Sequence, residues 1–174
     1  TNWIVPMLPN FGNQQEVKSS DYALDKSEKA FNVPEQASFV KLNSTESAYY
    51  IVDYSAGDLA KLIPQIENKT ISSVDRLAII RNCLLLSKAG KISTEVYLEI
   101  LKFYENDDSY VVWSEIASGF SELLTAFSGT PNYSSLNKYR LQMFSQLISR
   151  DTLGFIEKKT EVLNNKSLRG LAYL

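Results

Sequence analysis

The pattern of hydrophobic and polar positions changes near residue 55 of the chain. Before it lie three short runs rich in β-branched and aromatic residues, at 3–6, 39–42 and 48–54. Such runs are typical of strands in a half-buried sheet. Residues 10–36 between the first two runs are mostly polar, which predicts a long solvated loop with room for a short ribbon.

After residue 55, apolar residues recur at spacings of three and four, which predicts successive helices. Gly57 and Asp58 indicate the start of the first. The clearest helix begins at Ser72–Asp75, where a hydroxyl precedes a carboxylate by three residues, as in a capping box, and it should end at Ala89–Gly90. Its predicted buried face contains Leu77, Ile79, Ile80, Cys83, Leu84 and Leu86.

Further helices should begin at Ser93, near Asp108–Ser109, and at Ser134 or Ser135, with a last one over 161–174 after a break near 151–155. Antiparallel helix pairs joined by short turns are typical of an α-solenoid or irregular bundle. We therefore expect a mainly α fold of solenoid-like helical hairpins preceded by a few strands. Because the chain lacks an initiating Met and its last helix ends on Leu174 without a cap, we also expect a fragment of a longer protein.

The composition excludes several kinds of catalytic and metal site and several classes of partner. The 174 residues are 44% hydrophobic, which suits one domain or two small pieces, and no apolar run approaches the roughly 20 residues of a membrane helix. The sequence has no His, so imidazole catalysis and zinc sites built on His are excluded. Its one Cys excludes an internal disulfide or a thiolate zinc site. The net charge of −2, without a basic run, argues against nucleic acid or a membrane as partner.

The remaining candidates for chemistry each have a simpler structural interpretation. The acidic run Glu105–Asp108 lacks the Gly and the alternating ligands of a calcium loop, so we expect an exposed turn in which Asp108 caps the next helix. Asp53 and Asp58 could form a carboxylate pair, but Asp58 fits a helix start. Cys83 lies among leucines, where a thiol is usually a buried apolar group. Among the aromatic residues, those at helical spacing usually pack a core; they are Tyr97, Tyr104, Tyr110 and Trp113.

Four N-x-[S/T] sequons, at Asn43, Asn68, Asn132 and Asn165, exceed the roughly two expected by chance. They are slight evidence for a secretory or cell-surface location, and a cytoplasmic one stays open.

Four blocks in order resemble the zinc aminopeptidase family that includes aminopeptidase N, the puromycin-sensitive enzyme and the endoplasmic-reticulum peptide trimmers. The blocks are Trp3–Pro6, like W-x-[IV]-P; Ala48–Tyr54, like G-Y-Y-R-V-N-Y; Ile71–Arg76, like I-S-x-x-D-R; and Tyr110–Trp113, like Y-x-P-W. Ala48 and Val112 replace the Gly and the Pro of the family pattern. The resemblance spans almost the whole chain.

The resemblance implies a domain division: residues 1–54 would be the end of a small β-sandwich, and 55–174 the first part of the C-terminal helical domain. It also implies that zinc and the catalytic residues lie in an absent upstream domain, so this chain alone should be inactive and hold no catalytic, cofactor-binding or metal-binding residue.

The parent enzyme would remove N-terminal residues from peptides, with this part enclosing the peptide and supporting domain closure. Its partners would be the catalytic domain of the same enzyme and peptide substrates, and exposed apolar helix faces would favour self-association. Arg140 or Lys138 could meet a substrate C-terminus, although a solvated helix face is the simpler interpretation. The alternatives are a stand-alone helical interaction module and a catalytically dead relative.

Overall fold

Six α-helices dominate the part of the chain that the computed structural model describes, residues 3–12, 22–149 and 162–172. They are α1 (Ala56–Glu67), α2 (Ser73–Lys88), α3 (Thr94–Leu101), α4 (Tyr110–Ala126), α5 (Tyr133–Ile148) and α6 (Leu163–Ala172). Short 3₁₀ turns, η2 (Ser44–Glu46) and η3 (Lys102–Tyr104), precede α1 and follow α3. The mainly α fold class is confirmed. Residues 151–155 of the predicted break, and the two ends of the predicted 161–174 helix, lie outside the described residues.

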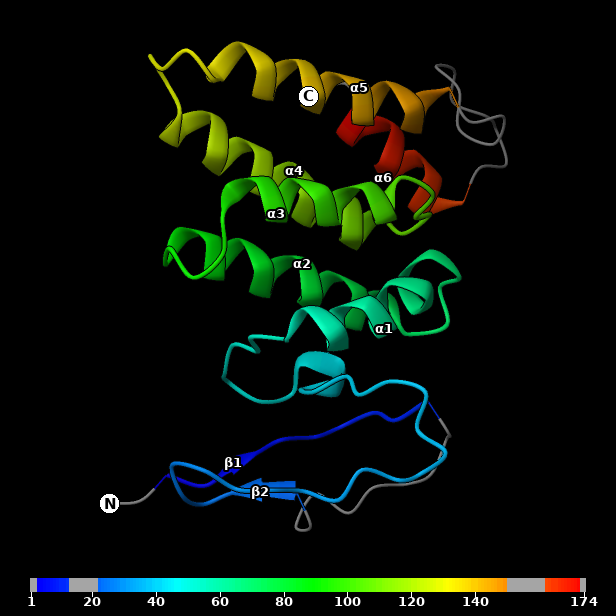
Figure 1. Cartoon of the computed structure of the whole chain (residues 1–174). Helices are drawn as coiled ribbons and strands as arrows, with labels where there is room; N and C mark the ends of the chain where they lie inside the picture. Colours follow the sequence, from blue (N-terminus) through cyan, green and yellow to red (C-terminus); the bar gives the residue numbers. More distant parts are fainter. Residues whose placement is uncertain (1–2, 13–21, 150–161, 173–174) are drawn as a thin grey trace.

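The helices form two rows. Helix α2 packs on α4 and α4 on α6, whereas α1 contacts η3 at the end of α3, and α5 packs against α4 and α6. Figure 1 shows the helices stacked in chain order from α1 to α5, with the strands at the opposite end from α5. This is the solenoid-like arrangement that short connections between amphipathic helices produce.

Local signals in the sequence set the limits of α2. The Ser72 hydroxyl accepts a hydrogen bond from the Asp75 N–H at 3.1 Å, as a capping residue does. Gly90 follows the helix with φ 69°, a conformation that glycine adopts at little cost. Most of the predicted buried face is buried, and Ile79 and Ile80 are fully so. Helix α2 is therefore the centre of the core.

The N-terminal segment contains less sheet than the sequence predicts. Strand β1 (Val5–Pro6) pairs antiparallel with β2 (Ala23–Leu24), which lies inside the predicted polar loop. The predicted strand at 39–42 is reduced to a single bridge between Lys41 and Asn10.

The predicted strand at 48–54 is wrong, because no ladder forms there among the described residues. The period-two alternation is nevertheless real: Val52 is buried, whereas Tyr49 and Ile51 are exposed. Hydrogen bonds from side chains, instead of a strand ladder, fix residues 48–54 against the rest of the N-terminal segment. The Tyr50 hydroxyl donates to the Met7 carbonyl, and the Tyr54 hydroxyl accepts from the Leu42 N–H at 3.0 Å. The division into two domains at residue 54 stays a prediction.

Candidate functional site

Two of the sequence blocks meet at a buried ion pair between α2 and the turn before α4. Arg76 donates from Nε to Asp107 Oδ2 at 2.6 Å and from Nη2 to Oδ1 at 3.1 Å. Arg76 and Asp107 are 4% and 3% exposed, and Trp113 Nε1 donates to the Asp107 carbonyl at 2.8 Å. A bidentate, desolvated pair of this kind fixes the geometry of its two elements. The blocks Ile71–Arg76 and Tyr110–Trp113 therefore have a structural role: they hold α2 against the turn before α4.

The expectation of an exposed turn whose Asp108 caps the next helix is confirmed only for the exposure of Asp108 itself; the exposure of the whole turn and the cap by Asp108 are wrong. Asp107 of that turn is buried, and Asp108 pairs with Lys69 at 2.8 Å. Helix α4 is capped from another helix: Asn164 Oδ1 accepts from the Tyr110 N–H at 2.8 Å, and its Nδ2 donates to the Asp108 carbonyl at 2.7 Å. Because 54 residues separate Asn164 from Tyr110, no local pattern could reveal this cap.

A second buried pair joins the N-terminal segment to α2. The Lys41 ammonium is 3.4 Å from Asp75 Oδ1, and both side chains are almost fully buried. Asp75 Oδ1 also accepts from the Thr45 N–H at 2.8 Å. Burial lowers the pKa of Lys41, and the nearby Asp75 carboxylate opposes that shift. Sequence reasoning missed this pair, because Lys41 lies in a run that looked like a strand.

Asn43, the first sequon, is fully buried in this region. Its Nδ2 donates to the Ala48 carbonyl at 2.7 Å, and its Oδ1 accepts from the Ala48 N–H at 2.8 Å. The side chain therefore serves as a structural clamp in the folded chain. Asn68 and Asn132 are exposed, and Asn165 is half-buried.

The reactive side chains singled out in the sequence are mostly core residues. Burial raises the pKa of the Cys83 thiol to about 12, which removes it from nucleophilic chemistry near neutral pH. Tyr97, Tyr104 and Trp113 are fully buried, and the Tyr104 hydroxyl donates to the Arg76 carbonyl at 2.9 Å. Tyr110 is 37% exposed.

Asp58 serves the start of α1. The Ser55 hydroxyl donates to its Oδ2 at 2.6 Å and accepts from its N–H at 3.1 Å. Asp53 is exposed ahead of the helix. The carboxylate pair considered from the sequence is thus replaced by a helix cap.

Across residues 3–12, 22–149 and 162–172, no group of three or more His, Cys, Asp or Glu side chains is placed to hold a metal ion. The described side chains therefore do not fit a zinc site, which needs three or four such ligands. In the same residues, no helix combines the length and the apolar character needed to cross a membrane.

Among the described residues, two of the grooves are candidates for binding because apolar side chains make up much of their lining. The first, which we call the α4–α5 groove, has a volume of about 570 Å³ and lies between α4, α5 and α6. Arg140 lines it with apolar neighbours such as Leu124 and Phe144, and its Nε donates to Asn137 Oδ1 at 3.2 Å. Lys138 is exposed and is not part of the lining. Of the two cations considered from the sequence, only Arg140 therefore lines the groove.

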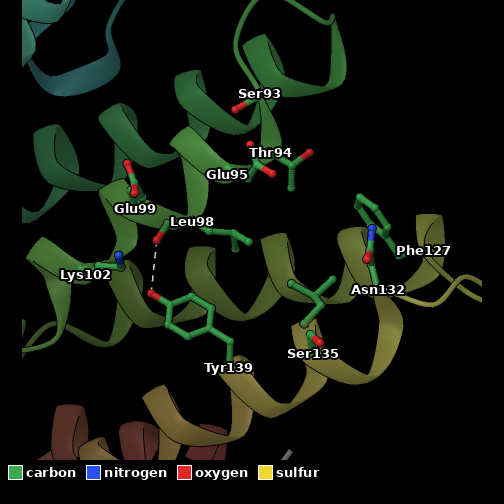
Figure 2. A pocket seen from close by; sticks show the side chains of 11 residues that line it. Ser93, Thr94, Glu95, Leu98, Glu99, Lys102, Phe127, Asn132, Ser135 and Tyr139 are labelled. Carbon is green, nitrogen blue, oxygen red and sulfur yellow. Dashed lines mark hydrogen bonds between the residues drawn. The ribbon is translucent and has the colours of Figure 1, made fainter.

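The second, which we call the α3–α5 groove, has a volume of about 670 Å³. Figure 2 shows Leu98 and Tyr139 converging on it from α3 and α5, where the Tyr139 hydroxyl donates to the Leu98 carbonyl at 3.2 Å. Phe127, just after α4, closes the far end. Sequence reasoning missed this groove, because it arises between two helices that are not consecutive.

Comparison with known proteins gives consistent matches. A family model described as the ERAP1-like C-terminal domain matches residues 39–174. The chain is 27% identical over 175 residues to a puromycin-sensitive aminopeptidase of Caenorhabditis elegans, covering 98% of the chain and 18% of that protein. It is 27% identical over 170 residues to an aminopeptidase N of Lactococcus lactis, covering 97% and 20%. An alanine/arginine aminopeptidase of Saccharomyces cerevisiae is 30% identical over 113 residues, covering 64% and 13%. The chain thus spans about a fifth or less of the length of these relatives.

Proposed function

Because the chain belongs to the ERAP1-like C-terminal domain family, we propose that it is a non-catalytic part of a zinc-dependent aminopeptidase. The parent enzyme removes N-terminal residues from peptides. The match to aminopeptidases over nearly the whole chain, but only about a fifth of their length, is the observation that carries the proposal.

In this proposal zinc belongs to a part of the parent protein outside this chain. The sequence contains no His, and the described carboxylates near cations have structural roles: Asp107 binds Arg76, and Asp75 lies against Lys41. The catalytic part of the same enzyme is therefore a partner of this chain. The helical rows supply a rigid wall that encloses the peptide and supports domain closure.

The α4–α5 groove is the part of this wall that we assign to the peptide. A guanidinium is a bidentate donor suited to a carboxylate, and Arg140 lies beside apolar Leu124, Phe144 and Leu171. The peptide's C-terminal carboxylate would meet Arg140, while an apolar side chain would contact the groove. Such an interaction would favour peptides long enough to reach from the catalytic centre to this groove.

The test has two parts. The isolated chain, with zinc added, should not hydrolyse an amino-acid anilide, whereas the full-length protein should do so in a chelator-sensitive manner. In the full-length protein, Arg140→Ala should raise KM for long peptides several-fold and leave the anilide KM unchanged, because the anilide does not reach the groove. Lys138→Ala is the matched control, since this neighbouring cation lies outside the lining.

Chelator-sensitive turnover by the isolated chain would contradict a non-catalytic role. A full-length protein without aminopeptidase activity would favour the catalytically dead relative. An equal effect of Arg140→Ala and Lys138→Ala would refute the assignment of the α4–α5 groove.

A further inference from the structure

The α3–α5 groove has a floor of apolar side chains. Leu136 is buried, and Leu98, Phe127 and Tyr139 are half-buried and pack on the core while facing the groove. Its volume of about 670 Å³ lies within the range of about 300–1,000 Å³ typical of ligand pockets. Apolar side chains of a partner would gain burial there.

Glu95 and Glu99 line the α3 side of this groove, and both are exposed. They are four residues apart on one helix, so they lie on the same face one turn apart. Among the described residues, neither forms an ion pair.

In the other helix row, the glutamates of one helix form ion pairs with cations of the neighbouring helix, which Glu95 and Glu99 do not in the described part of the chain. There, Arg81 and Lys88 of α2 pair with Glu115 and Glu122 of α4 at 2.8 and 2.6 Å. Both pairs span 34 residues, so cations two helices earlier in the chain, on the neighbouring helix of the same row, neutralise the carboxylates of α4.

Helix α5 offers no such cations to the α3–α5 groove. It contributes neutral side chains, including Ser135 and Tyr139, and the one cation in the lining is Lys102, just after α3. Figure 2 shows Lys102 at the end of the groove opposite Phe127, with Glu95 between them. Glu95 and Glu99 thus form an acidic rim on this groove that no described ion pair neutralises, so a cationic partner would complement it.

We propose that the α3–α5 groove docks an amphipathic helix of a protein partner, with apolar residues on the groove floor and two cations one turn apart opposite Glu95 and Glu99. Helix-in-groove binding uses this combination of apolar anchors and i, i+4 spacing. Charge complementarity at the rim sets the register and excludes acidic partners. This docking role is separate from the peptide contact assigned to the α4–α5 groove.

The probe is a fluorescent, staple-stabilised helical peptide of about 15 residues, because unconstrained helices of that length are marginal in water. It carries leucines on one face and two lysines four residues apart at the edge of that face. Fluorescence anisotropy with the whole 174-residue chain should show saturable binding that weakens as salt is added.

The double variant Glu95→Gln/Glu99→Gln should weaken binding about fivefold. Glu67→Gln, which alters an exposed carboxylate at the end of α1, should change it less than twofold.

Three results of the binding assay would overturn the proposal. They are no saturable binding, equal affinity for a peptide with Glu in place of both lysines, and an equal effect of Glu67→Gln. A concentration-dependent dimer in sedimentation, without peptide binding, would also overturn it, because a second copy would then fill the groove. Circular dichroism of each variant checks that the helices are intact.

Discussion

Gly119 gives Tyr97 room to lie against helix α4. Both residues are buried, and a Cβ atom at position 119 would collide with the Tyr97 hydroxyl. That hydroxyl has no hydrogen-bond partner within the described part of the chain. The contact therefore requires glycine inside a helix, where it costs about 1 kcal/mol relative to alanine.

We predict that Gly119→Ala lowers the free energy of unfolding by about 1–3 kcal/mol, as overpacking does. Tyr97→Phe removes the colliding oxygen, so it should cost little alone and restore stability in the double variant. Urea unfolding of the two single variants and the double variant measures this coupling. Additive effects in the double variant would show that the two side chains do not collide.

The reactivity of the Cys83 thiol reports on its burial in the core. With its pKa raised to about 12 by burial, roughly one thiol in ten thousand is ionised at pH 8. Reaction with an aromatic disulfide reagent should therefore be very slow in the folded chain and fast in denaturant. Stoichiometric labelling of the folded chain within minutes would contradict this burial.

At the scale of elements, the turn between η3 and α4 contains two neighbouring aspartates with different roles. Asp107 is buried against Arg76, whereas the Asp108 side chain is 69% exposed beside Lys69. Removing one member of a buried pair costs about 3–5 kcal/mol, and a surface pair contributes about 0–1 kcal/mol. Asp107→Ala should therefore lower the free energy of unfolding several times more than Asp108→Ala. Thermal or urea unfolding of the two variants measures this difference. Equal losses of unfolding free energy would contradict the assigned roles.

Helix α4 depends on α6 for its N-terminal cap. Asn164 bonds the Tyr110 N–H and the Asp108 carbonyl, and loss of a cap costs about 0.5–2 kcal/mol. Asn164→Ala should destabilise the chain by that amount and speed hydrogen exchange at the Tyr110 amide. Asn165→Ala is the control, because the described structure shows no bond from Asn165 to α4 and only a long one, of 3.5 Å, from Asn164 Nδ2 to Asn165 Oδ1. Unchanged exchange at Tyr110 in Asn164→Ala would mean that the cap does not form.

At the scale of the whole molecule, the Lys41–Asp75 pair couples the N-terminal segment to the helical rows. Backbone strain gathers in the same region, where the non-glycine residues Asn43, Thr45 and Glu46 have φ between 52° and 62°. Such conformations persist where surrounding contacts hold them. Here the Asn43 clamp and the bond from Thr45 to Asp75 supply those contacts.

We predict that Asp75→Ala costs about 3–5 kcal/mol, because it leaves the Lys41 ammonium buried without its counter-ion. Lys41→Met keeps the length of the side chain without the charge, and Asp75 then retains its bond from Thr45, so this variant should cost less. Limited proteolysis should cut Asp75→Ala within residues 42–54 sooner than Lys41→Met. Equal stability and equal cleavage of the two variants would contradict the coupling.

The helices were predictable where their signals are local. Ser72 and Gly90 bound α2 as the capping pattern predicts. Spacing alone is a weaker guide to packing in α3, where Val96 and Ile100 recur at helical spacing but Val96 is 41% exposed and the adjacent Tyr97 is fully buried. The strand predicted at 48–54 failed for a related reason: alternation identifies the inward face, but a ladder needs a neighbouring strand.

The sequence by itself determined the mainly α class, the limits of the clearest helices, the absence of imidazole chemistry and the resemblance to aminopeptidases. Each of these depends on residue identity or on contacts within a few positions. The tertiary structure decided the roles of Asp107, Asp75 and Asn164, whose partners lie 31, 30 and 54 residues away. It also decided which of Arg140 and Lys138 lines a groove. Whether a charge is buried, paired or exposed depends on the packing of distant elements, which no local pattern specifies.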